Sequence, residues 1–213
     1  MPWVKENADA VLVQWYAGEQ QGRTLADILL GKVNPSGKLN VSFPRSTGNT
    51  PCFYNHFVTD REEPFDQPGT PEEPKGHYIF DKPEPLWNFG HGKSYTTFDY
   101  VDCALSDTLL AASDTLKVSV MIKNTGRCDG KEVVQLYVRD KVSTVATPIQ
   151  QLKAFQKELV PVGYTREVKL VLPIAELALY NADMEEVIEP GEFELQIGSA
   201  SDDIRIRRTI IVR

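Results

Sequence analysis

The sequence has few cysteines, no long hydrophobic run and no cluster of basic residues. Its three cysteines, at positions 52, 103 and 128, are too few and too widely spaced for a disulfide framework or a zinc signature, although Cys52 and His56 lie four residues apart. No apolar run approaches the ~20 residues that span a bilayer. A net charge of −7 argues against a nucleic-acid partner, because such proteins neutralise phosphates with Lys and Arg.

The N-terminus also lacks the pattern of a secretory signal, since its apolar part is short and is preceded by charged residues. The cellular location is therefore not indicated by this chain. With 41% hydrophobic and 25% charged residues, the composition is that of an ordinary globular protein. A chain of 213 residues can form one large or two small domains, each with its own core.

A Gly-Lys-Ser run within "WNFGHGKSYTTFDY", residues 87–100, raises the question of a phosphate-binding loop. Such a loop needs a glycine five positions before the Gly-Lys pair, where this chain has Trp87. The preceding segment contains Pro83 and Pro85, which suit a central strand poorly, and the following segment is β-branched and aromatic rather than helical. The run therefore indicates a turn, in which Gly90 and Gly92 let the backbone change direction.

The first 44 residues are typical of the last pieces of an α/β sheet. "ADAVLVQWY", residues 8–16, is a nearly continuous apolar run that predicts a strand buried on both faces. "RTLADILLGK", residues 23–32, has helical apolar spacing and a stop at Gly31. "KLNVSFPR", residues 38–45, alternates apolar and polar residues and predicts a second strand.

Residues 45–86 show no sustained period and are rich in proline and acidic residues. A connection of this length without regular structure is uncommon in a compact protein, and it is usually functional or disordered. Its aromatic residues favour a loop that packs on another part of the protein.

From residue 98 onward, short alternating segments are separated by turn signals. Apolar residues occupy every second position in "LKVSVMIKNTG" (116–126) and in "KEVVQLYVRD" (131–140). Five later segments complete the pattern: residues 151–159, 166–173, 178–190, 191–198 and 204–212. In the last of these, Arg205 and Arg207 occupy the solvent face of a half-buried strand. Seven such segments predict a mainly β fold, a two-sheet β-sandwich.

Four long motifs together resemble the C-terminal portion of family 3 glycoside hydrolases, enzymes of the β-glucosidase and β-xylosidase type. They are "DAVLVQWYAGEQQGRTLADILLGKVNPSGKLNVSFPRS" (9–46), "PLWNFGHGKSYTTFDY" (85–100), "VMIKNTGRCDGKEVVQLYVRD" (120–140) and "EPGEFELQIGSASDDIR" (189–205). The resemblance implies that residues 1–97 are the end of the family's α/β-sandwich domain, with a long loop at about 45–86. Residues 98–213 would be its fibronectin type III-like, immunoglobulin-like β-sandwich domain.

The chain departs from the family pattern in two ways. The usual Pro-Gly-Gln-Glu-Gly-Gly loop is replaced by residues 17–22, Ala-Gly-Glu-Gln-Gln-Gly, which keep Gly18 and Gly22. More importantly, the resemblance places the catalytic aspartate on an N-terminal (β/α)8 barrel and the glutamate acid/base in an earlier part of the α/β domain. A barrel takes ~250 residues, more than this whole chain. We therefore expect no catalytic residue here, and no metal or cofactor.

The long loop is where this region would touch substrate, because the resemblance places it beside the mouth of the active site. Aromatic rings offer flat apolar faces and a polar edge to sugars, so Tyr54, His56 and Tyr78 are candidate substrate-binding residues, with plain packing as the alternative. The local carboxylates Glu62, Glu63, Glu72 and Glu73 lie in an acidic, proline-rich stretch where water would solvate them.

Two functions remain open at this stage. The first is the accessory end of a retaining β-glycosidase, inactive alone, whose partners are the barrel and the rest of the α/β domain and whose sandwich braces the catalytic domains. The second is a non-catalytic module that binds carbohydrate or protein, for which we would expect a row of exposed aromatic residues on one sandwich face. The apolar 8–16 segment also suggests self-association, or docking of the α/β remnant on the sandwich. The family is often periplasmic or secreted.

Overall fold

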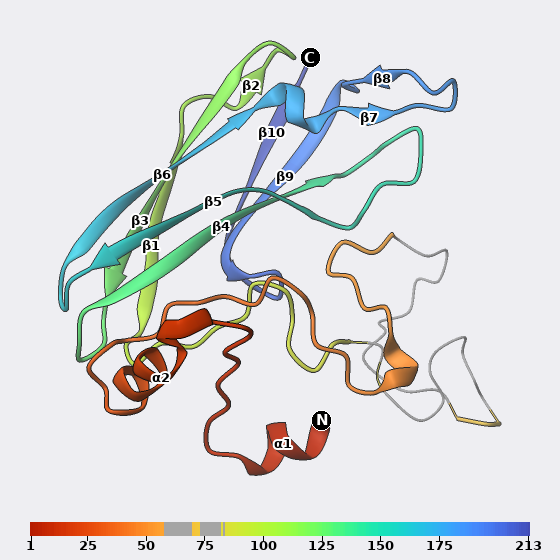
Figure 1. The fold of residues 1–213 in the computed structure, drawn as a ribbon. Coiled ribbons are helices and arrows are strands. Elements are labelled where there is room, and N and C mark those ends of the chain that lie inside the picture. The colour runs from red at the N-terminus through yellow and green to blue at the C-terminus, as the bar shows by residue number, and fades with distance from the viewer. Residues whose placement is uncertain (58–69, 73–81, 83) are drawn as a thin grey trace.

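The computed structural model describes residues 1–57, 70–72, 82 and 84–213. We call residues 1–97 the N-terminal region and residues 98–213 the sandwich. In Figure 1 the N-terminal region lies below one end of the sandwich. The sandwich holds the strands β1 (Phe98–Leu105), β2 (Leu109–Leu110), β3 (Thr115–Asn124), β4 (Gly130–Asp140), β5 (Gln151–Val160), β6 (Thr165–Pro173), β7 (Leu179–Tyr180), β8 (Glu186–Val187), β9 (Gly191–Ala200) and β10 (Asp203–Val212).

Two facing sheets make up the sandwich, as the sequence predicted. One sheet has the order β1-β3-β6 and the other β2-β10-β9-β4-β5, while β7 and β8 form a small hairpin. All neighbours pair antiparallel except β2 and β10, which are parallel. The short connections between consecutive strands allow this antiparallel order.

The core between the sheets follows the alternation of the sequence. Leu116, Val118, Val120 and Ile122 of β3 are at most 1% exposed, and the inward residues of β4, β6, β9 and β10 pack against them. Burying a Val, Leu or Ile side chain contributes about 1.5 to 3 kcal/mol each, so this set supplies most of the driving force for folding. The predicted alternation of β10 is also confirmed, with Arg205 and Arg207 exposed.

The N-terminal region holds two α-helices, α1 (Pro2–Asn7) and α2 (Gln21–Leu29), and 3-10 turns at Gly18–Gln20 and Thr47–Asn49. A third 3-10 turn, Ile174–Leu177, belongs to the sandwich. The predicted helix and its stop are confirmed in α2: Gly31 has φ +70, and the N–H of Lys32 donates to the Asp27 carbonyl at 2.8 Å, as in a Schellman cap. No helix among the described residues is long and apolar enough to cross a membrane.

The predicted strand over residues 8–16 was wrong. Residues 8–17 form an extended coil without strand pairing, and most of their apolar side chains are exposed, including Val11 (47%) and Trp15 (57%). An apolar run becomes a buried strand only where neighbouring strands satisfy its N–H and C=O groups, and no described segment of this chain does so.

The second predicted strand, residues 38–45, is not a regular strand in the structure. A short ladder between two segments of the chain takes its place. Phe43 forms an isolated antiparallel bridge with Trp87, and its N–H donates to the Trp87 carbonyl at 2.8 Å. Leu39 N–H donates to the His91 carbonyl at 2.8 Å, and Gly90 N–H donates to the Leu39 carbonyl at 2.7 Å. This ladder joins residues 39–43 to residues 87–91 within the N-terminal region.

Candidate functional site

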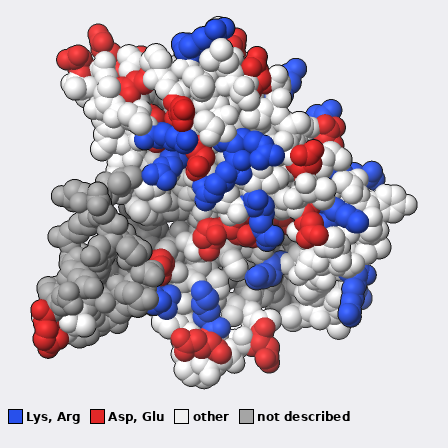
Figure 2. Space-filling model, turned by 180° about the vertical axis from the view of Figure 1, so that it is seen from behind, with Lys and Arg blue, Asp and Glu red and all other residues white. Residues whose placement is uncertain are grey.

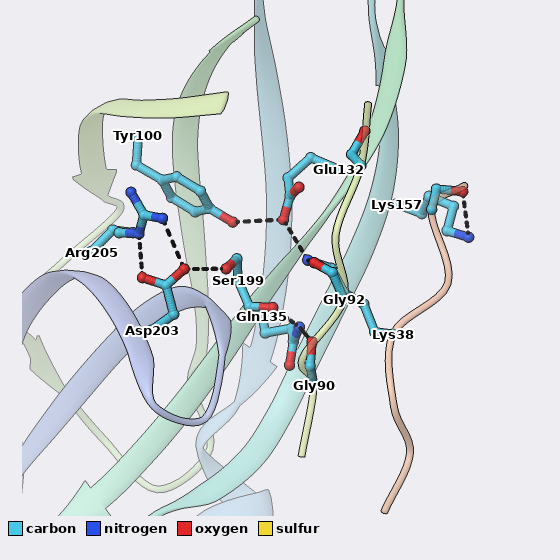
Figure 3. Close-up of polar contacts among 12 residues, drawn as sticks. Lys38, Gly90, Gly92, Tyr100, Glu132, Gln135, Lys157, Ser199, Asp203 and Arg205 are labelled. Carbon is cyan, nitrogen blue, oxygen red and sulfur yellow. Dashed lines mark hydrogen bonds and ion pairs between the residues drawn. The ribbon is translucent and has the colours of Figure 1, made fainter. Parts of the chain in front are cut away.

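The N-terminal region and the sandwich meet around the first half of β4, and we call these contacts the seam (Figure 3). At its centre Lys38 Nζ lies 3.2 Å from Glu132 Oε1, and the Tyr100 hydroxyl donates to the same oxygen at 3.3 Å. The side chains of Glu132 and Lys38 are 7% and 13% exposed. A charge removed from water in this way needs a close partner, since leaving it unpaired costs several kcal/mol. The seam therefore depends on residues from both parts.

Burial governs the protonation of this cluster. Desolvation raises the pKa of Glu132 above its ordinary value near 4.5, although the Lys38 ammonium acts in the opposite direction. The pKa of Tyr100 is also raised, first by burial and then by the negative charge of Glu132. A raised carboxyl pKa is one mark of a functional site, but here the group faces Lys38 and Tyr100 rather than a cleft, so a structural ion pair explains it.

On the opposite face of β4, the backbone of Gly90 lies against Gln135 and Tyr137. A Cβ at Gly90 would overlap the Gln135 side-chain oxygen and lie 3.0 Å from the Tyr137 hydroxyl, and Gly90 has φ +81. Gln135 Nε2 donates to the Ser199 carbonyl at 2.5 Å and to the Gly90 carbonyl at 3.4 Å. Only glycine satisfies both the conformation and the space.

Asn34 extends the seam through the hydrogen bonds of its side-chain amide. Its Nδ2 donates to the Asp129 carbonyl at 2.9 Å, and its Oδ1 accepts from the Ser94 hydroxyl at 2.9 Å and from the Tyr95 N–H at 2.8 Å. The amide thus joins the segment after α2 to the start of β4 and to the chain just before β1. Sequence reasoning missed both Asn34 and Lys38: they lie within the 9–46 motif, but no local pattern there indicates a partner in the sandwich.

Glu132 did carry a signal in the sequence. It shares the phase of the inward-facing Val134, Leu136 and Val138, so the strand period places it on the core side of β4. A carboxylate in phase with core positions predicts a buried charge and therefore a partner, although it does not identify Lys38.

The candidate substrate-binding residues lie at different depths. Tyr54 packs between rings: it stacks on Phe89, with centroids 4.2 Å apart, and meets Tyr137 edge-on at 5.8 Å. The side chain of His56 is exposed, and its Nδ1 lies 3.1 Å from the Phe57 carbonyl oxygen. Tyr78 lies outside the described residues.

Metal-ligand geometry is missing from the part of the chain that the structure describes, where no three His, Cys, Asp or Glu side chains gather. Cys52 Sγ lies 3.7 Å from the Ser42 carbonyl oxygen, and its thiol pKa is raised by burial. A structural zinc site takes four ligands, of which Cys52 and His56 would supply two at most.

Surface charges are mixed in sign. Figure 2 shows Lys and Arg interspersed with Asp and Glu on the face seen from behind. Two of the three arginines of β10 pair with acids: Arg205 Nε lies 2.5 Å from Asp203 Oδ1, and Arg207 Nη1 lies 2.6 Å from Glu194 Oε1. Such exposed pairs contribute little stability, but they break up the positive surface that phosphate binding would need.

Gly90→Ala should destabilise the protein more than Gly163→Ala. Both glycines have positive φ, which costs an L-residue about 1 to 2 kcal/mol, but a Cβ at Gly163 meets nothing within 4 Å. At Gly90 the overlap with Gln135 should add a further 1 to 3 kcal/mol or so. Urea unfolding followed by circular dichroism measures both, and equal losses would show that the seam is loosely packed.

Glu132→Gln should change the pH dependence of stability in a defined direction. Because the folded pKa of Glu132 is raised, the folded state holds its proton more tightly than the unfolded state. The stability of the wild type relative to the variant should therefore fall as pH rises from about 4.5 through the raised pKa.

Asp107→Asn is the matched contrast. Backbone N–H groups of Leu109 and Thr108 lower the Asp107 pKa, so the stabilisation that Asp107 gives is lost only as pH falls below about 3.8. Unfolding free energies from pH 3 to 8 measure both, and a flat Glu132→Gln difference would contradict the buried charge.

Both parts of the chain match known protein families. Residues 1–95 match the glycosyl hydrolase family 3 C-terminal domain, and residues 132–201 match the fibronectin type III-like domain. A β-xylosidase of Formosa agariphila is 38% identical over 205 residues, which are 95% of this chain and 27% of that protein. A periplasmic β-glucosidase of Salmonella typhimurium is 38% identical over 207 residues, 95% of this chain and 26% of that protein.

Solved structures agree. The β-glucosidase of Listeria innocua in complex with glucose superposes with a TM-score of 0.85 at 37% identity, covering 98% of this chain and 28% of that one. This chain thus spans about a quarter of the length of the relatives it matches. The fibronectin type III-like sandwich predicted from the sequence is confirmed. The chain belongs to glycoside hydrolase family 3 and corresponds to the C-terminal part of its β-glucosidases and β-xylosidases.

Proposed function

We propose that this chain is the accessory C-terminal part of a retaining β-glycosidase that releases terminal β-D-glucosyl or xylosyl residues. In this proposal residues 1–97 complete the α/β domain, residues 98–213 brace it, and the chain is inactive alone. The observation that carries the proposal is length: relatives of β-glucosidase and β-xylosidase type are about four times longer than the part this chain covers.

Two hollows in the described part do not suit glycoside hydrolysis. Retention needs two carboxyl groups ~5 Å apart around a sugar-sized cleft. A cavity of about 50 Å³ beside the end of β4 has Asp140 as its one carboxylate, and ligand pockets usually exceed ~300 Å³. A wider hollow of about 300 Å³ is lined by Arg139, Lys141 and Glu194, again with a single carboxylate.

Glu132 is the buried acid that most resembles a catalytic group, and its surroundings support a bracing role. Its residue is 5% exposed, and Lys38 and Tyr100 occupy the same oxygen. A sugar would have to displace both partners to reach that oxygen. The ion pair instead joins the N-terminal region to the sandwich, which is the mechanical connection a brace requires.

The missing part of the enzyme is the partner we propose for the exposed apolar side of the N-terminal region. Val11, Val13 and Trp15 lie on an unpaired extended segment, and Leu29 and Leu30 at the end of α2 are 70% and 69% exposed. Monomeric proteins seldom leave such groups uncovered. In the complete protein the preceding α/β segments would cover them; in the isolated chain the same surface favours self-association.

A separate binding module is less well supported. The described aromatic residues of the sandwich do not form an exposed row on one face. Tyr137 and Phe193 are buried, whereas Phe155 lies on β5, Tyr164 in the following turn, and Tyr180 on β7. Calorimetry with soluble glucans and xylans would detect such binding directly.

We expect the purified chain to leave an aryl β-glucoside or β-xyloside intact. The complete enzyme should hydrolyse at least one of them, since it alone would carry both catalytic carboxylates. Robust turnover by the chain alone that disappears when one of its own Glu residues is replaced by Gln would contradict the proposal.

Within this function, His56 and Tyr78 are proposed to contact substrate. His56 is exposed at the start of the long loop, where an aromatic ring can meet a sugar. Alanine at either position in the complete enzyme should raise the KM for extended glycosides more than the KM for an aryl monoglycoside. Unchanged KM values in both variants would remove these residues from the site.

A further inference from the structure

Tyr54, the third candidate, is held on three sides by the rest of the chain. Its ring stacks on Phe89 at 4.2 Å with 17° between the planes, and its edge contact with Tyr137 spans 5.8 Å at 69°. Its hydroxyl accepts a hydrogen bond from the Leu152 N–H at 3.2 Å. Stacked and edge-on aromatic pairs add to the stability that burial gives, and the hydroxyl contact fixes the ring direction.

His56 and Phe57, two and three residues after Tyr54, are attached to the sandwich as well. The Ile149 N–H donates to the His56 carbonyl at 2.9 Å, and Phe57 forms an antiparallel bridge with Pro148. Both contacts come from the connection between β4 and β5. The side chains of His56 and Phe57 nevertheless remain exposed, Phe57 at 56%. The sandwich thus holds the backbone of His56 and Phe57, while their side chains point to the solvent-exposed surface.

The surface that receives Tyr54 is itself fixed. Tyr137 is fully buried, and its hydroxyl donates to Gln135 Oε1 at 2.5 Å. Gln135 Nε2 in turn bonds the Ser199 carbonyl at 2.5 Å, which ties the network to β9, the neighbour of β4. A saturated buried network of this kind has one arrangement, so a group packed on it takes a defined position.

We propose that Tyr54 is a positioning residue, through which the β4–β5 side of the sandwich sets the place of His56 and Phe57 for substrate binding. This rests on the proposed function and deepens it: the sandwich acts on substrate affinity as well as on stability. Tyr54 acts through the backbone of residues 54–57, and its ring is occupied by Phe89 and Tyr137 rather than by sugar.

The first test needs no activity and uses this 213-residue chain. Tyr54→Ala should speed amide hydrogen exchange at both Leu152 and Ile149 by roughly tenfold or more, because the segment that covers them is released. Tyr54→Phe should speed exchange at Leu152 alone, since the ring contacts persist. Tyr164→Ala, the removal of an exposed tyrosine in the β5–β6 turn, is the matched control and should leave both amides unchanged. Exchange at Ile149 that is unaffected by Tyr54→Ala would overturn the anchor.

The second test measures KM and kcat in the complete enzyme. Ile149→Pro removes the N–H that holds His56 from the sandwich side and leaves the loop sequence intact. Both Ile149→Pro and Tyr54→Ala should raise the KM for an extended glycoside about fivefold, the loss of roughly one hydrogen bond, with kcat within about twofold of wild type. Tyr54→Phe should restore most of the affinity.

The outcomes separate the two claims. A raised KM in Tyr54→Ala with an unchanged KM in Ile149→Pro would mean that Tyr54 meets the sugar directly, and would overturn the positioning role. A complete enzyme without glycosidase activity would overturn the proposed function, while the exchange experiment would still decide whether Tyr54 anchors the segment.

Discussion

A buried carboxylate at the start of β4 is the constraint on which the rest of the structure depends. Glu132 cannot stay ionised at 5% exposure without a counter-charge, and Lys38 from the N-terminal region supplies it. Lys38 is in place because the backbone ladder between residues 39–43 and 86–91 fixes the chain beside it. The same ladder delivers Gly90 to the other face of β4, against Gln135. The N-terminal region therefore contacts β4 on both of its faces.

These contacts with β4 are important because the N-terminal region has almost no hydrophobic core of its own. Among the described residues of the N-terminal region, Leu86 is the one buried apolar side chain, beside the polar Asn49 and Thr96, and α2 buries none of its side chains fully. Hydrophobic burial, which stabilises the sandwich, is therefore nearly absent here. Order in the N-terminal region comes from the seam on one side and, in our proposal, from the preceding part of the enzyme on the other. In that proposal the sandwich, through the seam, holds the N-terminal region in place for the rest of the α/β domain.

The sandwich could be predicted from the sequence because a two-residue period states directly which side chains face a core, as in Leu116 to Ile122 of β3. Helix α2 could also be predicted, from the helical spacing of its apolar residues and from the stop at Gly31. The strand prediction for residues 8–16 failed for a physical reason. An apolar run indicates that a segment is to be covered, whereas a strand also needs a neighbouring segment that pairs with its backbone N–H and C=O groups. The seam itself could not be predicted. The position of Glu132 in the strand alternation indicates a buried charge, but nothing in the sequence identifies Lys38 as its partner. The stacking of Tyr54 on Phe89 is likewise a long-range contact without a local pattern.

The central claim, that the seam makes the N-terminal region and the sandwich fold as one unit, has a direct measurement. All three tryptophans, Trp3, Trp15 and Trp87, lie in the N-terminal region, so tryptophan fluorescence reports on it, while far-ultraviolet circular dichroism reports mainly on the strands of the sandwich. Urea unfolding of the chain at neutral pH should give coincident transitions by the two probes. A fluorescence transition at clearly lower urea than the circular dichroism transition would show that the N-terminal region detaches on its own, and would contradict the account.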